Sequence, residues 1–215
     1  MKRSFDAAEL EMMDRPQAVS AELERDLRNL QQLNKYFGSY RLVLNFVHRW
    51  IKPGEHVSID DQARAIGAPV EIDALDQQGA TLEIARKLSA NYPEISYVEA
   101  NILEWDPDAP YDIVLCSLAL HHFSDEDAVR VLKRCRELSR RFVLVSDLRR
   151  GLLLAVGVYL LTAFVFREPM TRYDGRLSAA RAFSFGELRE LAHEAGWQNF
   201  GQKRFRFGRQ GIWLE

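Results

Sequence analysis

The chain has 215 residues, of which 47% are hydrophobic, so it can bury a large core as one domain with an appendage. Its formal net charge of -2 at pH 7 gives no general reason to expect a nucleic-acid partner. The N-terminus begins with basic residues but has no apolar stretch behind them, and Cys116 and Cys135 do not have metal-ligand spacing. We therefore expect a reduced, cytoplasmic protein without a secretory signal.

Two helices are predicted before the first strand. Ser20 can cap a helix whose one face carries four leucines, and Gly38 is placed to end it. A second amphipathic helix runs from about Leu42 to Trp50. We expect residues 1–52 to form a helical cap on an α/β domain that covers residues 53–215, and the plainer alternative is a helical hairpin that covers hydrophobic surface.

From residue 56 onward, β-like runs alternate with helical patterns, which predicts a parallel sheet built from βαβ units. Ser124 and Ser184 each begin a helix with a capping box. The last two strands form an antiparallel pair joined through Arg209 and Gln210. The predicted fold class is α/β and Rossmann-like, with seven mostly parallel strands that cover residues 56–59, 70–76, 95–101, 111–120, 141–148, 202–208 and 211–215.

Ligands bind beyond the carboxyl ends of the strands in open parallel sheets. Asp76, Asn101, Asp147 and the segment 117–123 lie at such ends. The carboxylate of Asp76 can accept both hydroxyls of a ribose, or it can cap the following helix. The side-chain oxygen of Asn101 can bind an adenine amino group, or it can satisfy the backbone of a local turn.

Five segments together resemble the class I S-adenosylmethionine-dependent methyltransferases: "IDALDQQGATLEIARK", "YVEANILEW", "YDIVLCSLALHHFSDEDAVRVLKRC", "RRFVLVSDLRR" and "AFSFGELRELAHEAGW". The N-terminal "MMDRP" and "RNLQQLNKYFG" are similar to a subgroup of small-molecule methyltransferases found beside aromatic polyketide genes. The resemblance implies S-adenosylmethionine as the cofactor. It implies that Asp76 binds the ribose, that Gln77 lies beside the adenine, that Asn101 takes the adenine amino group, and that Ile102 and Ser117 complete the cofactor site.

The sequence departs from these relatives after the first strand, where they carry an acid and a glycine-rich turn. Residues 59–70 would have to hold a turn, a helix and a return loop, and such a crossover needs at least about 10 to 12 residues. We infer that the printed chain skips about 15 to 20 residues, which predicts a break in the backbone between Ile59 and Gln62. The rival hypothesis is a real deletion, which would leave a catalytically silent binding or scaffold protein without the cofactor loop.

His121 and His122 follow the fourth strand and are the candidate catalytic residues. Methyl transfer to a phenol or enol oxygen benefits from a general base, and histidine suits that role near neutral pH. The alternative is a pair that only fixes the loop through hydrogen bonds. Two adjacent histidines lack the third ligand of a zinc site, so we expect no metal.

Residues 151–166 carry no charge, but a spanning helix needs about 20 apolar residues. We therefore favour an apolar lid, inserted at about residues 151–182, over peripheral membrane contact. The lid implies a small hydrophobic acceptor. Four polar residues after the apolar run either line the pocket or, as we expect for most, are solvated loop charges: Tyr173, Asp174, Arg176 and Arg181.

These patterns predict an enzyme that methylates a small hydrophobic acceptor, at oxygen rather than carbon, such as a phenolic or polyketide-like compound. A weaker alternative is a nucleotide-dependent oxidoreductase, because an acid after the second strand also suits NAD.

Overall fold

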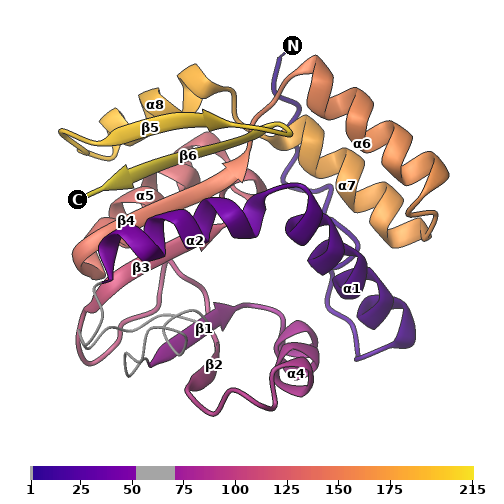
Figure 1. Ribbon diagram of the computed structural model, residues 1–215, viewed down its shortest axis with the longest axis horizontal. Helices are drawn as coiled ribbons and strands as arrows, with labels where there is room; N and C mark the ends of the chain where they lie inside the picture. The colour runs from indigo at the N-terminus through magenta and orange to yellow at the C-terminus, as the bar shows by residue number, and fades with distance from the viewer. Residues whose placement is uncertain (1, 52–70) are drawn as a thin grey trace.

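The computed structural model describes residues 2–51 and 71–215. Its larger sheet has the order β3-β4-β6-β5, with β3 at Tyr111–Ser117, β4 at Ser139–Leu148, β6 at Arg209–Leu214 and β5 at Gly201–Phe205 (Figure 1). β3 and β4 are parallel, and β6 is antiparallel to both of its neighbours. The predicted antiparallel hairpin at a sheet edge is therefore confirmed.

The turn of this hairpin lies earlier than predicted. Arg209 and Gln210 belong to β6, and the chain reverses just before them, where Phe207 and Gly208 have φ of 56° and 66°. A left-handed conformation suits glycine, which explains why the turn is built around Gly208.

A second, two-stranded parallel sheet pairs β1 (Ile72–Asp76) with β2 (Ile95–Glu99), and α4 (Gly79–Leu88) connects them. The expectation of one seven-stranded sheet is wrong for the described residues, which hold six strands in two sheets. Among the described residues, β1 pairs only with β2. The two sheets approach at the start of β3, where the Tyr111 hydroxyl donates to the Asp73 carboxylate over 2.7 Å.

The strand predicted over residues 56–59 lies outside the described residues, and so does the predicted break between Ile59 and Gln62.

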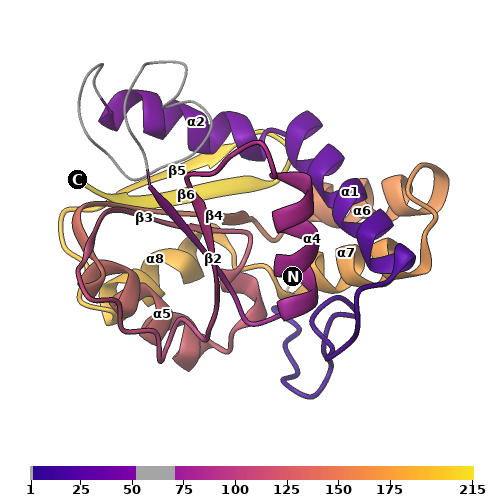
Figure 2. The same ribbon diagram turned by 90° about the horizontal axis from the view of Figure 1, so that it is seen from below.

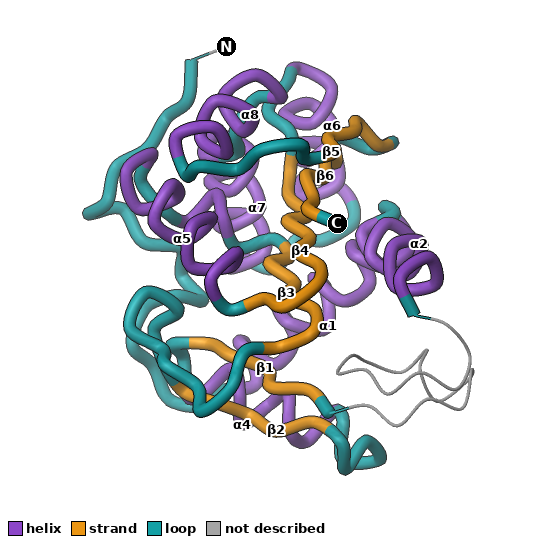
Figure 3. The backbone as a smooth tube through the Cα atoms, turned by 90° about the vertical axis from the view of Figure 1, so that its left-hand side faces the viewer, coloured by secondary structure: helices purple, strands orange, loops and turns teal. Residues whose placement is uncertain are grey.

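Helices cover both faces of the four-stranded sheet (Figure 3). α2 (Ser39–Trp50) packs on one face, where Ile113 and Leu144 are buried beneath it. α5 (Asp125–Glu137) and α8 (Phe185–Glu194) pack on the other face, over Val143 and Val145. Successive residues of β4 thus point into opposite cores, which explains why residues 142–145 of the strand are all apolar.

The predicted caps are present. The Ser20 hydroxyl accepts a hydrogen bond from the Leu23 amide at the start of α1 (Ala21–Tyr36), and Gly38, with φ of 83°, separates α1 from α2. The Ser184 hydroxyl and the Glu187 carboxylate form a complete capping box at the start of α8. The Ser124 hydroxyl accepts from the Asp127 amide at the start of α5.

The apolar run forms α6 (Leu152–Phe164), which packs against α7 (Pro169–Arg181). Figure 2 shows α4, α1 and the α6–α7 pair next to one another, and a cluster of Leu23, Ile84 and Met170 joins α1, α4 and α7. Within the described residues, no helix is long and apolar enough to cross a membrane.

The expectation of solvated loop charges after this run is wrong for two of the four residues. Asp174 and Arg181 lie on α7 and are each 2% exposed. The reason is that both groups find backbone partners in the N-terminal segment. Asp174 accepts from the amide of Met12, and the Arg181 guanidinium donates to the carbonyl of Asp6.

Candidate active site

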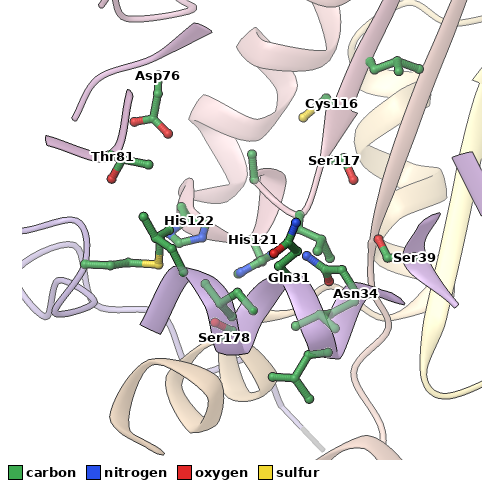
Figure 4. A pocket seen from close by; sticks show the side chains of 18 of the residues that line it. Gln31, Asn34, Ser39, Asp76, Thr81, Cys116, Ser117, His121, His122 and Ser178 are labelled. Carbon is green, nitrogen blue, oxygen red and sulfur yellow. The ribbon is translucent and has the colours of Figure 1, made fainter. Parts of the chain in front are cut away.

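The described residues line one large cleft with a volume of about 1990 Å³. Its walls include side chains from α1, β1, β3, α6 and α7 (Figure 4). Small-molecule pockets usually measure roughly 300 to 1,000 Å³. The cleft therefore has room for a cofactor and an acceptor together.

His121 is paired with a buried carboxylate. It lies in the short 3-10 helix η1 (Leu120–His122) that follows β3, and Asp147 is at the end of the neighbouring parallel strand β4. The Nδ1 atom of His121 is 2.6 Å from Oδ1 of Asp147, and the His121 amide donates to Oδ2 over 2.9 Å. Their exposed fractions are 3% and 1%. Within the described part of the chain, Nε2 of His121 makes no hydrogen bond, so this atom is left for a ligand.

Asp147 stays ionised despite its burial. Burial alone would raise the pKa of its carboxyl group, but the charge and hydrogen bond of His121 and the Leu148 amide hold that pKa below its usual value. The ionised carboxylate of Asp147 accepts a hydrogen bond from Nδ1 of His121, which leaves Nε2 as the ring atom that a ligand can reach.

His122 has a different environment from its neighbour, although the two rings lie 4.3 Å apart. Its Nδ1 atom is 2.7 Å from Oδ2 of Asp14, and its Nε2 atom is 4.0 Å from Oε2 of Glu11. Burial lowers the pKa of His122, but the hydrogen bond to Asp14 and the charges of Glu11, Asp14 and Asp147 raise it to about 9. His122 is therefore protonated at neutral pH, which leaves His121 as the candidate base.

The sequence did not predict Glu11 and Asp14 as site residues. Both belong to the N-terminal segment, more than 100 residues from the histidines, and no local pattern separates them from other acids. The position of "EMMD" beside the histidines follows from contacts with distant parts of the chain. The closest signal in the sequence was "MMDRP", which was noted only as part of a resemblance.

α7 holds this segment in the cleft. The two carboxylate oxygens of Asp174 accept from the amides of Met12 and Met13 over 2.6 and 3.0 Å. The Ser178 hydroxyl donates to Oε1 of Glu11 over 2.7 Å. These bonds fix the carboxylate of Glu11, which is only 2% exposed, beside the two histidines.

The predicted cofactor residues lie on the β1 side of the same cleft. Asp76 ends β1, and its Oδ1 atom accepts from the Gln78 amide over 2.8 Å. Burial raises the pKa of Asp76, the backbone hydrogen bond from Gln78 opposes this, and the charge of Asp14 adds to it. Figure 4 shows Asp76 beside Thr81, across the cleft from Ser117. Gln77, Ile102 and Ser117 also line the cleft.

Asn101 differs from the other predicted cofactor residues. It is not among the residues that line the cleft, and its Oδ1 atom accepts from the Leu103 amide over 3.0 Å. In this structure its side chain therefore makes the local turn contact that the sequence left open as the alternative to adenine binding.

Residues 56–141 match a family model described as a methyltransferase domain. This range contains all seven predicted site residues. A comparison with curated proteins finds no match to the chain.

Solved structures with the same fold are methyltransferases of several kinds. A candidate O-methyltransferase from Nostoc punctiforme is 18% identical, with 67% of this chain and 44% of that chain covered and a TM-score of 0.50. Human N-acetylserotonin methyltransferase in complex with S-adenosylmethionine is 16% identical, with 70% and 41% covered and a TM-score of 0.51. The plantazolicin methyltransferase BpumL with S-adenosylhomocysteine is 10% identical, with 71% and 69% covered and a TM-score of 0.53.

The chain spans less than half the length of the first two of these proteins. Residues 56–141 thus match a methyltransferase domain, and about two thirds of the chain shares its fold with these solved structures.

Proposed function

We propose that this protein transfers a methyl group from S-adenosylmethionine to a small hydrophobic acceptor, at the oxygen of a phenolic or polyketide-like compound. One observation carries the proposal. His121, whose ring is bound to Asp147, lines the same cleft as Asp76, the carboxylate suited to a ribose.

The residues of the cleft fit the cofactor. Asp76 would hold the ribose hydroxyls, with Gln77, Ile102 and Ser117 around the nucleoside. Glu11, Asp14 and Asp76 place carboxylates along the cleft, and Arg149, Arg206 and Arg209 place cations along it. The cofactor supplies the electrophilic methyl group.

His121 would act as the general base. Asp147 holds the residue by two hydrogen bonds, one with the ring and one with the backbone amide, so Nε2 can take the proton of the acceptor hydroxyl as the oxygen attacks. A phenol becomes a stronger nucleophile as it loses this proton. His122, already protonated and bonded to Asp14, would instead tie the N-terminal segment to the catalytic loop.

The apolar wall of the cleft suits a hydrophobic acceptor. Leu154, Val158 and Leu161 of α6 line it, which supports the division into a lid at about residues 151–182, a cap at residues 1–52 and a methyltransferase domain at residues 53–215. The closed apolar surroundings would also keep water from the methyl group.

Calorimetry with S-adenosylhomocysteine on the full-length protein tests the proposal. Binding with a dissociation constant of about 1 to 100 μM, which corresponds to roughly 5 to 8 kcal/mol, supports the enzyme. Absence of binding at millimolar ligand would favour the scaffold hypothesis, and displacement of the ligand by NAD would favour the oxidoreductase.

A further inference from the structure

Three side chains that can bind a metal ion converge in the cleft: Glu11, His121 and His122. One ligand atom of each lies within 4.8 Å of the others. Glu11 and His121 are almost fully buried, whereas the His122 side chain is 25% exposed. The sequence had argued against a metal because two adjacent histidines lack a third ligand, and the fold supplies that ligand from the N-terminal segment.

The second ring nitrogen of each histidine is already held by a carboxylate. Nδ1 of His121 lies 2.6 Å from Asp147, and Nδ1 of His122 lies 2.7 Å from Asp14. Histidines that bind metals almost always give their other ring N–H to such a partner, which fixes the ring and raises the basicity of the ligand atom. The Nε2 atoms of both rings are therefore the two ligand atoms.

The carboxylate of Glu11 is buried, and its cationic partner among the described residues is not close. Its carboxylate is 2% exposed, and among the described residues its single ion pair is the 4.0 Å contact with His122. The Ser178 hydroxyl bonds Oε1, which leaves Oε2 toward the histidines. A buried carboxylate without a close cationic partner is costly, and a bound cation would remove that cost.

We propose that Glu11, His121 and His122 form a binding site for one divalent transition-metal ion, with Zn²⁺ as the ion of best fit. Two histidines and one glutamate are a known ligand set of zinc sites that keep an open position. Zinc binds these atoms at about 2.0 to 2.2 Å, which puts tetrahedral ligands about 3.4 Å apart. The groups must therefore close by up to about 1.4 Å, mainly through movement of the less buried His122.

The ion would occupy the Nε2 atom that otherwise takes the proton of the acceptor. Metal binding and base catalysis by His121 are then mutually exclusive, so Zn²⁺ inhibits methyl transfer. This consequence rests on the proposed function, whereas the metal site itself does not.

The test uses the full-length protein, freed of metal with EDTA and then dialysed. Titration calorimetry with zinc chloride should show one ion bound per chain. Glu11→Gln keeps the shape of the side chain and its bond to Ser178 but removes the charge, and it should weaken binding at least tenfold, as should His122→Asn. Asp14→Asn, which alters only the partner of a ligand, should weaken binding about 10- to 100-fold. The exposed His48, changed to Asn, is the matched control and should leave binding unchanged.

X-ray absorption at the zinc edge of the loaded wild-type protein gives a result that does not depend on variants. Two imidazole nitrogens and oxygen ligands at about 2.0 to 2.2 Å support the site. Sulfur ligands would assign the ion to Cys116 and Cys135 and overturn the proposal. Binding that the Glu11 and His122 variants leave unaltered would overturn it as well. If zinc binds at this site but does not inhibit methyl transfer, only the proposed role of His121 as the base is contradicted.

Discussion

Two adjacent histidines of the same type acquire different properties from their partners. His121 is paired with Asp147 at the end of the neighbouring strand, and the sequence had already placed both residues at the functional edge of the sheet. His122 is paired with Asp14 and held protonated, which no local pattern could indicate because Asp14 lies 108 residues away. The position of the histidines at the functional edge of the sheet was predictable from the sequence. Which of the two is protonated was not, because this depends on contacts with distant residues.

Replacement of His121 by Ala should lower turnover on a phenolic acceptor by about a hundredfold or more, because general base catalysis contributes that much. The affinity for S-adenosylhomocysteine should stay within about twofold, since the cofactor would bind at the β1 side. Steady-state kinetics and calorimetry measure the two effects, and His48→Ala is the control for a surface histidine. Equal losses in thermal stability and turnover would point to a structural role for the ring.

Replacement of Asp76 by Asn should weaken binding of the cofactor instead of lowering base catalysis. Hydrogen bonds to a charged group contribute about 1.5 to 3 kcal/mol, so the affinity for S-adenosylhomocysteine should fall by at least about tenfold. The KM for the acceptor should change little. Glu126→Gln on the exposed face of α5 provides a matched loss of charge. Unchanged cofactor affinity in Asp76→Asn would show that the carboxylate serves only as a helix cap.

At the scale of elements, the helices that carry a clear apolar stripe and a cap were predicted, and α7 was not. Its sequence has a glycine in the middle and charged residues on the buried side. Those charges are stabilised by the N-terminal segment, and the glycine faces α6, so the helix depends on partners far away in the sequence. Propensity alone cannot indicate such a helix.

The glycines of this region give opposite expectations. A Cβ atom at Gly175 would meet side chains of α6 at 3.6 Å, an ordinary contact, so Gly175→Ala should stabilise the protein by about 0.4 to 1 kcal/mol. Gly208 has φ of 66° and would place a Cβ 3.0 Å from Leu154, so Gly208→Ala should destabilise by about 1 kcal/mol or more. Urea unfolding of both variants measures the difference. Stabilisation by Gly208→Ala would show that the hairpin turn differs from the one described.

The two faces of α6 separate an acceptor-binding role from a membrane role. Leu154, Val158 and Leu161 line the cleft, whereas Val156 and Leu160 are not among the lining residues and are 48% and 49% exposed. Val158→Ser with Leu161→Ser should raise the acceptor KM at least fivefold, since each lost apolar contact weakens binding by roughly 1 kcal/mol. Val156→Ser with Leu160→Ser, the matched change on the outer face, should leave that KM unchanged. If the outer pair instead abolishes sedimentation with lipid vesicles, α6 is a membrane anchor.

At the scale of the whole molecule, the sequence predicted the alternation of strands and helices and the terminal hairpin, because these depend on local periodicity. It did not predict that the described strands divide into two sheets, or that residues between Leu10 and Pro16 line the cleft. Both features depend on which distant surfaces meet. The N-terminal segment and α7 share their polar contacts across about 160 residues of chain, so the cleft is assembled only when the whole chain has folded.

This assembly should depend on pH through Asp174. Burial, followed by the charges of Glu11 and Asp26, raises the pKa of its carboxyl group to about 7, although the amides of Met12 and Met13 oppose the shift. In the unfolded chain the pKa is near 3.8. The folded state therefore binds the proton more tightly, and this contribution to stability is complete below about pH 4 and lost as pH rises through about 7. Between these limits the free energy of unfolding should fall by about 2 to 4 kcal/mol.

Urea unfolding in EDTA, from pH 4 to 8, measures the fall. Asp174→Asn, which is neutral throughout, should flatten the profile, and Glu126→Gln on the exposed face of α5 should not. A free energy of unfolding that rises with pH in the wild type would contradict this prediction. It would mean that the amides of Met12 and Met13 outweigh burial and keep the Asp174 carboxylate ionised, so that the N-terminal segment binds α7 through a charged rather than a protonated Asp174.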